Sequence, residues 1–365
     1  MEQLNICFFE TYYGGSHKSF ADGLVKNSSH DIELYTLPEK NYKWRIRGSA
    51  LYLLENDLDI DHDILLVSDM FNVADYKALR GKKALPVINY FHENQITYPH
   101  NNSVSDFSLG MINITSALCS DKIIFNSHTH YNDFINSIPV FLDRAPDYKP
   151  LWVEKNIKDK CSILYPGCDF DENNETISIN KTPLIIWNHR WDYDKKPESF
   201  FHLLRSLKEN SIEFQVALLG LNYENKPKLF KKAEVEFKDN IVFSGFAKTK
   251  EDYINWLRKG DIVISTAIQE NFGYSVVEAI HYGCFPILPN RLSYPEIVPE
   301  DYHKEILYDD MDELIIKTIK TIKTIKNLKK HENMLQELSD YMKRYSWNNL
   351  INKYDKELRD IKNEN

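Results

Sequence analysis

The chain has 365 residues, of which 42% are hydrophobic and 27% charged, and this composition excludes a disordered protein and predicts two folded domains of ordinary size. Its 45 basic and 54 acidic residues give a formal charge of -9, which excludes indiscriminate binding to nucleic acid or anionic membranes. The five cysteines show no zinc-binding spacing and lie mostly in apolar stretches, which is typical of reduced thiols in a cytoplasmic protein. No basic leader precedes the first apolar strand and no apolar run has the length of a membrane span. We therefore expect no signal peptide and at most a peripheral membrane contact.

Short apolar runs and helical stretches alternate in the first half of the chain. Strands are predicted at residues 4–10, 32–37, 64–68, 86–91 and 122–126, with a sixth in the segment CSILYPG. A helix is predicted at residues 107–119, whereas the stretch 139–160, rich in Pro, Asp and Lys, indicates an irregular excursion. The polar residues 169–182 indicate a linker and hence a domain boundary.

A glycine-rich loop follows the first strand. Gly14 and Gly15 predict a tight turn, and Ser16 is a candidate N-cap for the next helix. The loop lacks the G-x-G-x-x-G spacing and the lysine of a P-loop, so it does not predict a dinucleotide or ATP site. A plain turn and a loop that faces an anion both remain open.

Cations alternate with aromatic residues in the segment PEKNYKWRIR. The cations are Lys40, Lys43, Arg45 and Arg47, and the aromatic residues are Tyr42 and Trp44. This pattern suits a phosphodiester backbone and its bases. A solvated start of a helix has the same composition, and both interpretations stay open.

A polar cluster of His92, Glu93 and Asn94 follows the strand 86–91. Sites in α/β proteins are assembled at the carboxyl ends of strands. His92 is therefore a candidate to hydrogen-bond a reacting sugar, against the alternative of a structural histidine.

The second half of the chain repeats the alternation. Strands are predicted at residues 184–188, 214–219 and 241–243, and helices at 197–208, 226–237 and 250–259. The segment IIKTIKTIKTIKNLKK predicts a surface helix and a weak candidate for membrane-surface contact. The pattern predicts an α/β protein with two doubly wound domains that face a cleft. These are residues 1–170, with a last helix at 346–364 packing back on them, and residues 171–345.

Residues 261–295 predict a strand, a polar turn, a helix and a second strand. Glu270 lies in the turn, Glu278 lies eight residues on in the helix, and Gly273 allows close approach of the backbone. The N-terminus of a helix at the end of a parallel strand binds anions, so the stretch favours a phosphate-bearing ligand. Ordinary helix-end charges are the alternative interpretation of the two glutamates.

Arg190 and Lys195 follow the first strand of the second half and suit a diphosphate, whose charge they would stabilise as it leaves. Asp192 and Asp194 form a DxD-like pair beside them. We expect no metal there, because these cations and the helix at Gly273 already neutralise charge.

At this point the sequence shows a resemblance. Arg190 and Lys195, followed by the E-x-F-G-x4-E pattern from Glu270 to Glu278, resemble the donor site of retaining glycosyltransferases of the two-domain GT-B fold. The segments ETYYGGSHKSF, NYFHENQITYP, IFNSHTHYNDF and NHRWDYDKKPESFF closely resemble the glycosyltransferase family that includes tRNA-queuosine alpha-mannosyltransferase. The resemblance covers nearly the whole chain.

The resemblance implies transfer of mannose, with retention and without a metal or cofactor, from GDP-mannose to a hydroxyl of queuosine in the anticodon of a tRNA of the tRNA-Asp type. The implied catalytic residues are Glu270, His92, Arg190 and Lys195. The implied donor site comprises Gly15, Arg190, Lys195, Glu270, Asn271, Phe272, Gly273, Tyr274, Ser275 and Glu278, with Glu278 on the ribose. The candidate acceptor and tRNA site comprises Ser16, His17, Lys43, Arg45, Arg47, Glu93 and Asn94.

Three alternatives accompany this prediction. One is a GT-B glycosyltransferase that acts on a lipid or glycan, and another is a nucleotide-sugar epimerase or hydrolase. The third is a non-catalytic protein that binds sugar nucleotides or RNA. Arg190, Lys195, Glu270 and Glu278 together argue against the last, because binding alone does not need them all.

Overall fold

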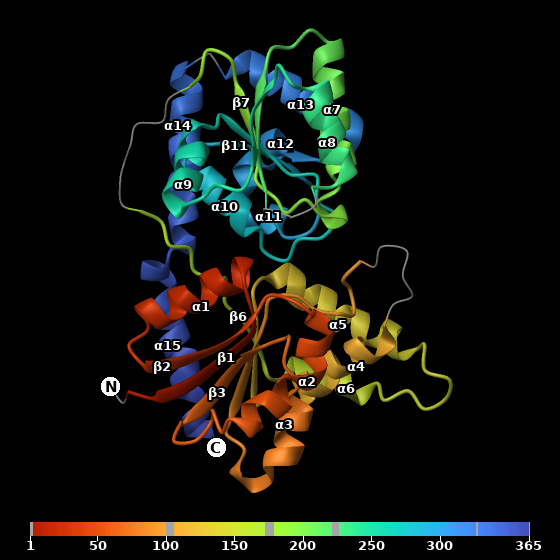
Figure 1. Cartoon of the computed structure of the whole chain (residues 1–365), viewed down its shortest axis with the longest axis vertical. Coiled ribbons are helices and arrows are strands. Elements are labelled where there is room, and N and C mark those ends of the chain that lie inside the picture. The colour runs from red at the N-terminus through yellow and green to blue at the C-terminus, as the bar shows by residue number, and fades with distance from the viewer. Residues whose placement is uncertain (1–2, 100–105, 172–178, 221–225, 326–327, 365) are drawn as a thin grey trace. The chain divides into compact units, whose positions relative to one another are not determined.

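The computed structural model describes residues 3–99, 106–171, 179–220, 226–325 and 328–364 (Figure 1). The chain divides into a first unit, Met1–Asp169 with Tyr345–Asn365, and a second unit, Phe170–Arg344. The predicted domains, 1–170 and 171–345, differ from these units by one residue at each boundary. Residues 172–178 of the predicted linker lie outside the described part of the chain.

The described residues of the first unit form one six-stranded sheet with helices on both faces. Its elements are β1 (Asn5–Tyr13), α1 (Gly15–Asn27), β2 (Asp31–Pro38), α2 (Tyr42–Glu55), β3 (Ile64–Ser68), α3 (Val73–Arg80), β4 (Val87–Phe91), α4 (Phe107–Cys119), β5 (Lys122–Phe125), α5 (His128–Leu142), α6 (Trp152–Lys158), β6 (Cys161–Ile163) and α15 (Trp347–Glu364). The strands pair in parallel in the order β2-β1-β3-β4-β5-β6.

Alternate residues of β1 show how the two faces are covered. Phe8 packs in a cluster with Phe20 of α1 and Tyr354 of α15. Its neighbour Phe9 packs in a cluster on the other face with Tyr76 of α3. Because successive side chains of a strand point to opposite faces, a strand covered on both sides is apolar over most of its length. This is why apolar runs without alternation predicted the strands correctly.

The last helix, α15, packs on the first unit beside α1 (Figure 1). Trp347 lies so close to Gly23 and Gly167 that a Cβ atom on either glycine would come within 2.2 Å of the indole. The carboxylate of Asp355 accepts hydrogen bonds from the hydroxyls of Ser28 and Ser29, at 2.7 and 2.6 Å. Because glycine has no side chain, these two positions make room for Trp347, which packs α15 on the unit.

Two local predictions in the first unit are wrong. The stretch 139–160 is not irregular throughout, because α5 continues through Pro139 to Leu142 and α6 begins at Trp152. Burial of Ile138 and Phe141 against the sheet outweighs the hydrogen bond that a proline removes from a helix. Ser16 is not the N-cap of α1, since Gly14 holds that position in extended conformation.

The described residues of the second unit form another six-stranded sheet. Its elements are β7 (Leu184–Trp187), α7 (Pro197–Glu209), β8 (Gln215–Leu219), α8 (Lys228–Glu236), β9 (Ile241–Gly245), α9 (Lys250–Lys259), β10 (Ile262–Ile264), α10 (Tyr274–His281), β11 (Phe285–Pro289), α11 (Tyr294–Ile297), α12 (His303–Ile306), β12 (Leu307–Tyr308), α13 (Met311–Thr324) and α14 (Leu328–Met342). The parallel order is β12-β11-β10-β7-β8-β9.

Each sheet has a point where the strand order reverses. In the first unit it lies between β1 and β3, and in the second between β7 and β10. At such a switch point the chain segments that follow the two neighbouring strands run to opposite faces of the sheet. The carboxyl ends of these two strands then border a crevice in which ligands bind. The polar residues that follow β1, β3, β4, β7 and β10 therefore lie at the positions that the fold offers to ligands.

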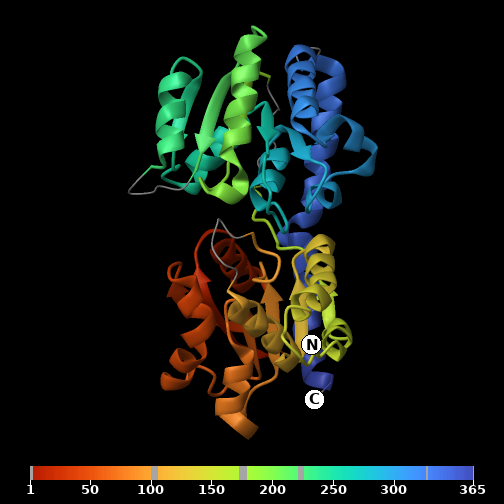
Figure 2. The same ribbon diagram turned by 90° about the vertical axis from the view of Figure 1, so that its right-hand side faces the viewer.

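The repetitive segment, residues 315–330, is not one helix as predicted: its first part belongs to α13, which packs against α7 (Figure 2), and its last three residues belong to α14. Its buried face contains Leu314, Thr318, Thr321 and Ile322, whereas Ile316 is exposed. Residues 326 and 327 of the segment lie outside the described part. Every helix among the described residues is too short or too polar to cross a membrane.

Candidate active site

Lys195 is the centre of the site in the second unit. Its Nζ atom donates hydrogen bonds to the carbonyl oxygen of Gln269 at 2.8 Å and to Oε2 of Glu270 at 3.2 Å. It also lies 3.2 Å from Oδ2 of Asp194. The turn after β7 and the turn after β10 are thus joined by one ammonium group.

The charge of Lys195 is maintained although the side chain is buried. Burial favours the neutral amine, but the carboxylates of Glu270 and Asp194 outweigh it and raise the lysine pKa above its ordinary value. Arg190 lies 3.5 Å from the same Asp194 and its side chain is 45% exposed. The predicted pair therefore consists of one fixed internal cation and one cation at the surface.

Glu270 is held at both carboxylate oxygens. Oε2 contacts Lys195, and Oε1 accepts a hydrogen bond from the backbone N–H of Gly273 at 3.1 Å. Gly273 has a φ of 96° and is the N-cap of α10, whose first turn contains no acidic residue. The left-handed backbone conformation explains the glycine, and it brings the helix N-terminus beside the carboxylate.

Glu278 lies on α10 and receives a hydrogen bond of 3.1 Å from the hydroxyl of Tyr253. The side-chain amide of Asn188 donates to that hydroxyl at 3.0 Å and to the carbonyl oxygen of Ser275 at 2.7 Å. The sequence analysis missed Asn188 and Tyr253. Asn188 directly follows β7, two residues before Arg190, and this position was a usable signal, whereas nothing in the local sequence marks Tyr253 on α9.

The other predicted donor residues of this unit lie in and around the same turn, whereas Gly15 begins α1 of the first unit. The side chain of Asn271 accepts a hydrogen bond from Gln269, Phe272 is buried, and Tyr274 and Ser275 open α10. The DxD-like pair faces the cations. Asp194 is buried between Arg190 and Lys195, and Asp192 lies 3.7 Å from Arg190. Both carboxylates thus serve as partners of the cations.

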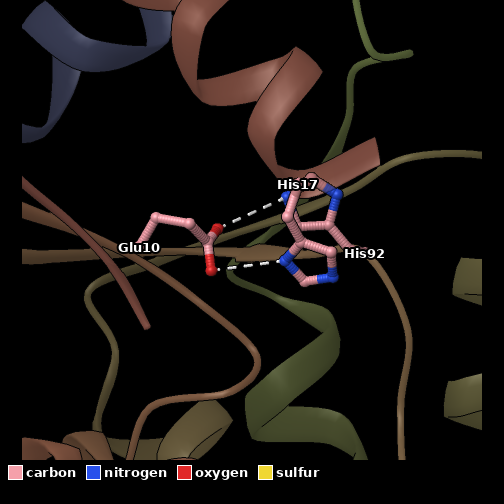
Figure 3. Close-up of side chains that lie close together, drawn as sticks. All are labelled: Glu10, His17 and His92. Carbon is pink, nitrogen blue, oxygen red and sulfur yellow. Dashed lines mark ion pairs between the residues drawn. The ribbon is translucent and has the colours of Figure 1, made fainter. Parts of the chain in front are cut away.

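Three buried side chains meet at the switch point of the first unit: Glu10 from β1, His17 from α1 and His92 from the end of β4 (Figure 3). Nδ1 of His17 lies 3.3 Å from Oε1 of Glu10, and Nε2 of His92 lies 3.9 Å from Oε2. The imidazole rings stack with their centroids 4.0 Å apart. The structure therefore unites the predicted residues His17 and His92 around Glu10, which the sequence analysis missed because it looked like an ordinary buried strand end.

The three groups hold different charges. Burial opposes protonation of His17, but the Glu10 carboxylate outweighs it and raises the His17 pKa to about 9. Burial and the charge of His17 lower the pKa of His92 well below its ordinary value. At neutral pH the cluster is therefore an ion pair of Glu10 and His17 beside a neutral His92.

Asp69 supports His92 from the end of β3. Its Oδ1 atom accepts the backbone N–H groups of His92 and Glu93 at 2.9 and 3.3 Å. Burial, and then the nearby charge of Glu93, raise the pKa of Asp69 to about 8. The loop after β4 is thus anchored to the neighbouring strand.

Glu10, His17 and His92 are also a possible metal-binding group, because one ligand atom from each lies within 4.8 Å of the others. The two rings are tilted by 32° to each other. Each ring faces a different oxygen of Glu10 (Figure 3). The geometry does not decide between an ion pair and a bound metal, and metal independence stays a prediction.

The predicted acceptor residues fall into two groups. Ser16 is exposed on the first turn of α1, close in sequence to His17, whereas Asn94 accepts the N–H groups of Ile96 and Thr97 and so stabilises its own turn. The second group lies on α2, where Lys43 is exposed and Arg45 donates to the carbonyl oxygen of Pro38.

Arg47 of that second group is held by the unit itself. Its guanidinium contacts Asp106 and the hydroxyl of Ser108, both at 2.7 Å. Hydrogen bonds from Ser108 and Arg47 lower the pKa of Asp106 to about 2. Arg47 therefore anchors the start of α4, and any contact with tRNA would have to compete with this ion pair.

Known protein families match both parts of the chain. Residues 5–168 match the family described as tRNA-queuosine alpha-mannosyltransferase N-terminal, and residues 169–340 match glycosyl transferases group 1. A Drosophila melanogaster protein named tRNA-queuosine alpha-mannosyltransferase is 34% identical over 369 residues, which cover 96% of this chain and 95% of that protein.

Solved structures show the fold. Sucrose-phosphate synthase from Thermosynechococcus elongatus superposes with a TM-score of 0.73 at 12% identity, and the alignment covers 100% of both chains. The catalytic domain of starch synthase IV from Arabidopsis thaliana gives 0.70 at 13% identity, covering 99% of this chain and 100% of that one. The expected GT-B fold is thereby confirmed. Together with the sequence matches, these findings show that the chain belongs to the tRNA-queuosine alpha-mannosyltransferase family of glycosyltransferases.

Proposed function

We propose that this protein transfers a mannosyl group from GDP-mannose to a hydroxyl of queuosine in tRNA, with retention of anomeric configuration and without a metal. The observation that carries the proposal is the group of Arg190, Lys195 and Glu270 beside the N-terminus of α10, in a chain of this family. This group can hold a diphosphate and a sugar together. The residue roles below belong to the proposal.

The bond between the anomeric carbon and the diphosphate oxygen breaks as positive charge builds on the sugar. Lys195, Arg190 and the N–H groups that open α10 stabilise the negative charge on the departing diphosphate. The acceptor hydroxyl forms its bond to the anomeric carbon on the same face, and its proton passes to an oxygen of the leaving diphosphate. Glu270 supplies a carboxylate near the developing oxocarbenium ion, and Glu278 binds the ribose.

The fixed geometry of Glu270 favours electrostatic stabilisation over covalent catalysis. Both of its oxygens already accept hydrogen bonds, from Lys195 and from Gly273. A carboxylate that is held in this way keeps its charge and orientation through the reaction. We further propose that the first unit binds the acceptor, with His92 beside the sugar, and that the protein is cytoplasmic, where its tRNA substrate resides.

The test is incubation of the purified protein with GDP-mannose and queuosine-containing tRNA, followed by digestion and mass spectrometry of the nucleosides. We expect the mass of queuosine to rise by one hexose, and Glu270→Ala to abolish this product. The same tRNA without queuosine is the control and gains no hexose. If queuosine stays unmodified while GDP-mannose is bound or hydrolysed, the proposed acceptor is wrong and lipid or glycan acceptors come next.

A further inference from the structure

Two aromatic side chains stand exposed at the start of α2. Trp44 is 63% exposed and Tyr42 is 36% exposed. Together with Asn41 and Lys43 they line a hollow that is open to solvent. None of these residues is among the predicted donor-binding residues.

Gly48 holds the indole of Trp44 in place. A Cβ atom on Gly48 would lie 3.0 Å from two carbons of the indole ring, so the ring rests on the backbone of α2 one turn along. Glycine inside a helix costs about 1 kcal/mol relative to alanine. Its presence here is explained by the close approach of the ring, which leaves the opposite face of the indole to solvent.

The segment that carries the ring holds four cations, although the chain has a net charge of -9, and partial burial and then the nearby carboxylates of Glu93 and Asp106 raise the pKa of Tyr42. Lys40 and Lys43 are exposed on either side of Tyr42. Arg45 and Arg47 contact the protein itself, through the carbonyl oxygen of Pro38 and the carboxylate of Asp106. The exposed surface is therefore an aromatic platform with two lysines.

We propose that Trp44, with Tyr42 beside it, is a stacking platform for an unpaired base of the tRNA anticodon loop, whose phosphates contact Lys40 and Lys43. The inference rests on the proposed function, because that function brings an anticodon loop to the protein. Unpaired bases of RNA loops are bound by stacking on aromatic rings with cations along the backbone. Duplex RNA hides its bases and is a poor ligand for such a platform.

The experiment is titration of the full-length protein with an anticodon stem-loop RNA, measured by fluorescence anisotropy of the labelled RNA. Stacking on one aromatic ring contributes enough that Trp44→Ala should weaken binding about 10-fold or more. Trp44→Phe keeps a ring and should retain most of the affinity. A duplex RNA of equal length should bind the wild type and Trp44→Ala equally weakly.

Two matched controls separate stacking from general apolar contact. Leu51 is 55% exposed on the same helix, and Trp152 is 54% exposed on α6 of the same unit. Leu51→Ala and Trp152→Ala should bind the stem-loop as the wild type does. If Leu51→Ala weakens binding as much as Trp44→Ala, the surface docks an apolar partner and the stacking proposal is overturned.

Salt dependence provides a second readout. Loss of one phosphate contact reduces the slope of log affinity against log salt by about 0.7 for single-stranded nucleic acid. Lys43→Ala should show this reduction, whereas Trp44→Ala should keep the wild-type slope at lower affinity. A lowered slope in Trp44→Ala would contradict a stacking role.

Failure of this inference is distinguishable from failure of the proposed function. Wild-type protein that transfers mannose to tRNA while Trp44→Ala binds the stem-loop with unchanged affinity overturns the platform alone. Stem-loop binding that depends on Trp44, without any mannose transfer, overturns the proposed reaction and supports the platform. Gly48→Ala, which crowds the indole, should weaken stem-loop binding in the same direction as Trp44→Ala.

Discussion

At the switch point of the second unit the positive charge lies on a lysine and an arginine, whereas at that of the first unit it lies on a histidine. In both places the cation contacts a carboxylate at the end of a parallel strand. Lys195 faces Glu270 after β10, and His17 faces Glu10 on β1. The same fold thus builds one site with permanent charges and another whose charge depends on pH.

This difference makes the two sites suitable for different ligand groups. A diphosphate needs positive charge at every physiological pH, and the raised pKa of Lys195 ensures it. The His17 imidazolium loses its proton as pH rises through about 9, and His92 beside it is neutral. Histidine pairs can donate and accept hydrogen bonds, which suits hydroxyl groups better than phosphates.

The largest effect is expected from Lys195→Ala. Turnover should fall about 1000-fold because the leaving diphosphate loses its internal cation. The free energy of unfolding should also fall by about 3–5 kcal/mol, because Asp194 and Glu270 lose their shared partner. Steady-state kinetics and urea denaturation measure the two losses. Unchanged stability would contradict the role of Lys195 as the centre of the charge cluster.

Arg190→Ala sharpens the comparison within the second unit. Loss of this exposed cation should lower turnover about 100-fold and change the free energy of unfolding by less than about 1 kcal/mol. The control is Arg205→Ala, since Arg205 is 43% exposed, pairs with Glu236 and lies in the same unit. It should have wild-type turnover. Equal losses in the two variants would show that surface charge in general, not the donor clamp, is responsible.

Glu10→Gln tests the titratable site of the first unit. In the wild type His17 has a pKa raised to about 9, so its stabilising contribution is complete below about 6.5 and is lost as pH rises through 9. This contribution is on the order of 3 kcal/mol. The variant should lose this dependence, because burial then favours neutral His17. Unfolding experiments from pH 6 to 10 and NMR titration of the imidazole measure the change.

The matched control for this experiment is Glu33→Gln. Glu33 is an exposed carboxylate whose Oε2 atom lies 3.2 Å from Nε2 of His62 in the same unit. Exposed pairs contribute little to stability, so the unfolding free energy of this variant should depend on pH as that of the wild type does. If Glu10→Gln also keeps this dependence, the His17 proton is not held by Glu10.

The smallest effects are expected at Gly273 and Gly15, which lie at the N-termini of α10 and α1. Gly273 has a φ of 96°, and a Cβ atom there would lie 3.3 Å from Cδ1 of Ile297. Gly15 has a φ of 49° and open space around that position. Gly273→Ala should cost about 2 kcal/mol of unfolding free energy, and Gly15→Ala about 1 kcal/mol. Thermal unfolding measures both, and a larger loss for Gly15→Ala would reverse the expected order.

Some features could be predicted because they are written in local sequence. Strands covered on both faces are apolar at every position, so the runs at Ile64–Ser68 and Leu184–Trp187 were visible. Glu270 and Gly273 were recognisable by their spacing. A helix that begins after a glycine, with a carboxylate in the preceding turn, needs these two residue types close together in the sequence. The C-terminal helix was predicted at residues 346–364, and the structure has it at Trp347–Glu364.

Other features were decided by the tertiary structure alone. Which strand ends become neighbours depends on the order of strands in the sheet, and no local pattern records that order. For this reason Glu10 could not be assigned to His17 and His92, nor Tyr253 to Glu278, before the fold was known. Arg47 is predicted to contact tRNA, and only the fold shows that Asp106 is its partner within the unit. The sequence by itself thus determined the architecture and the residues of the proposed donor site, while the packing of distant segments decided which side chains share charge.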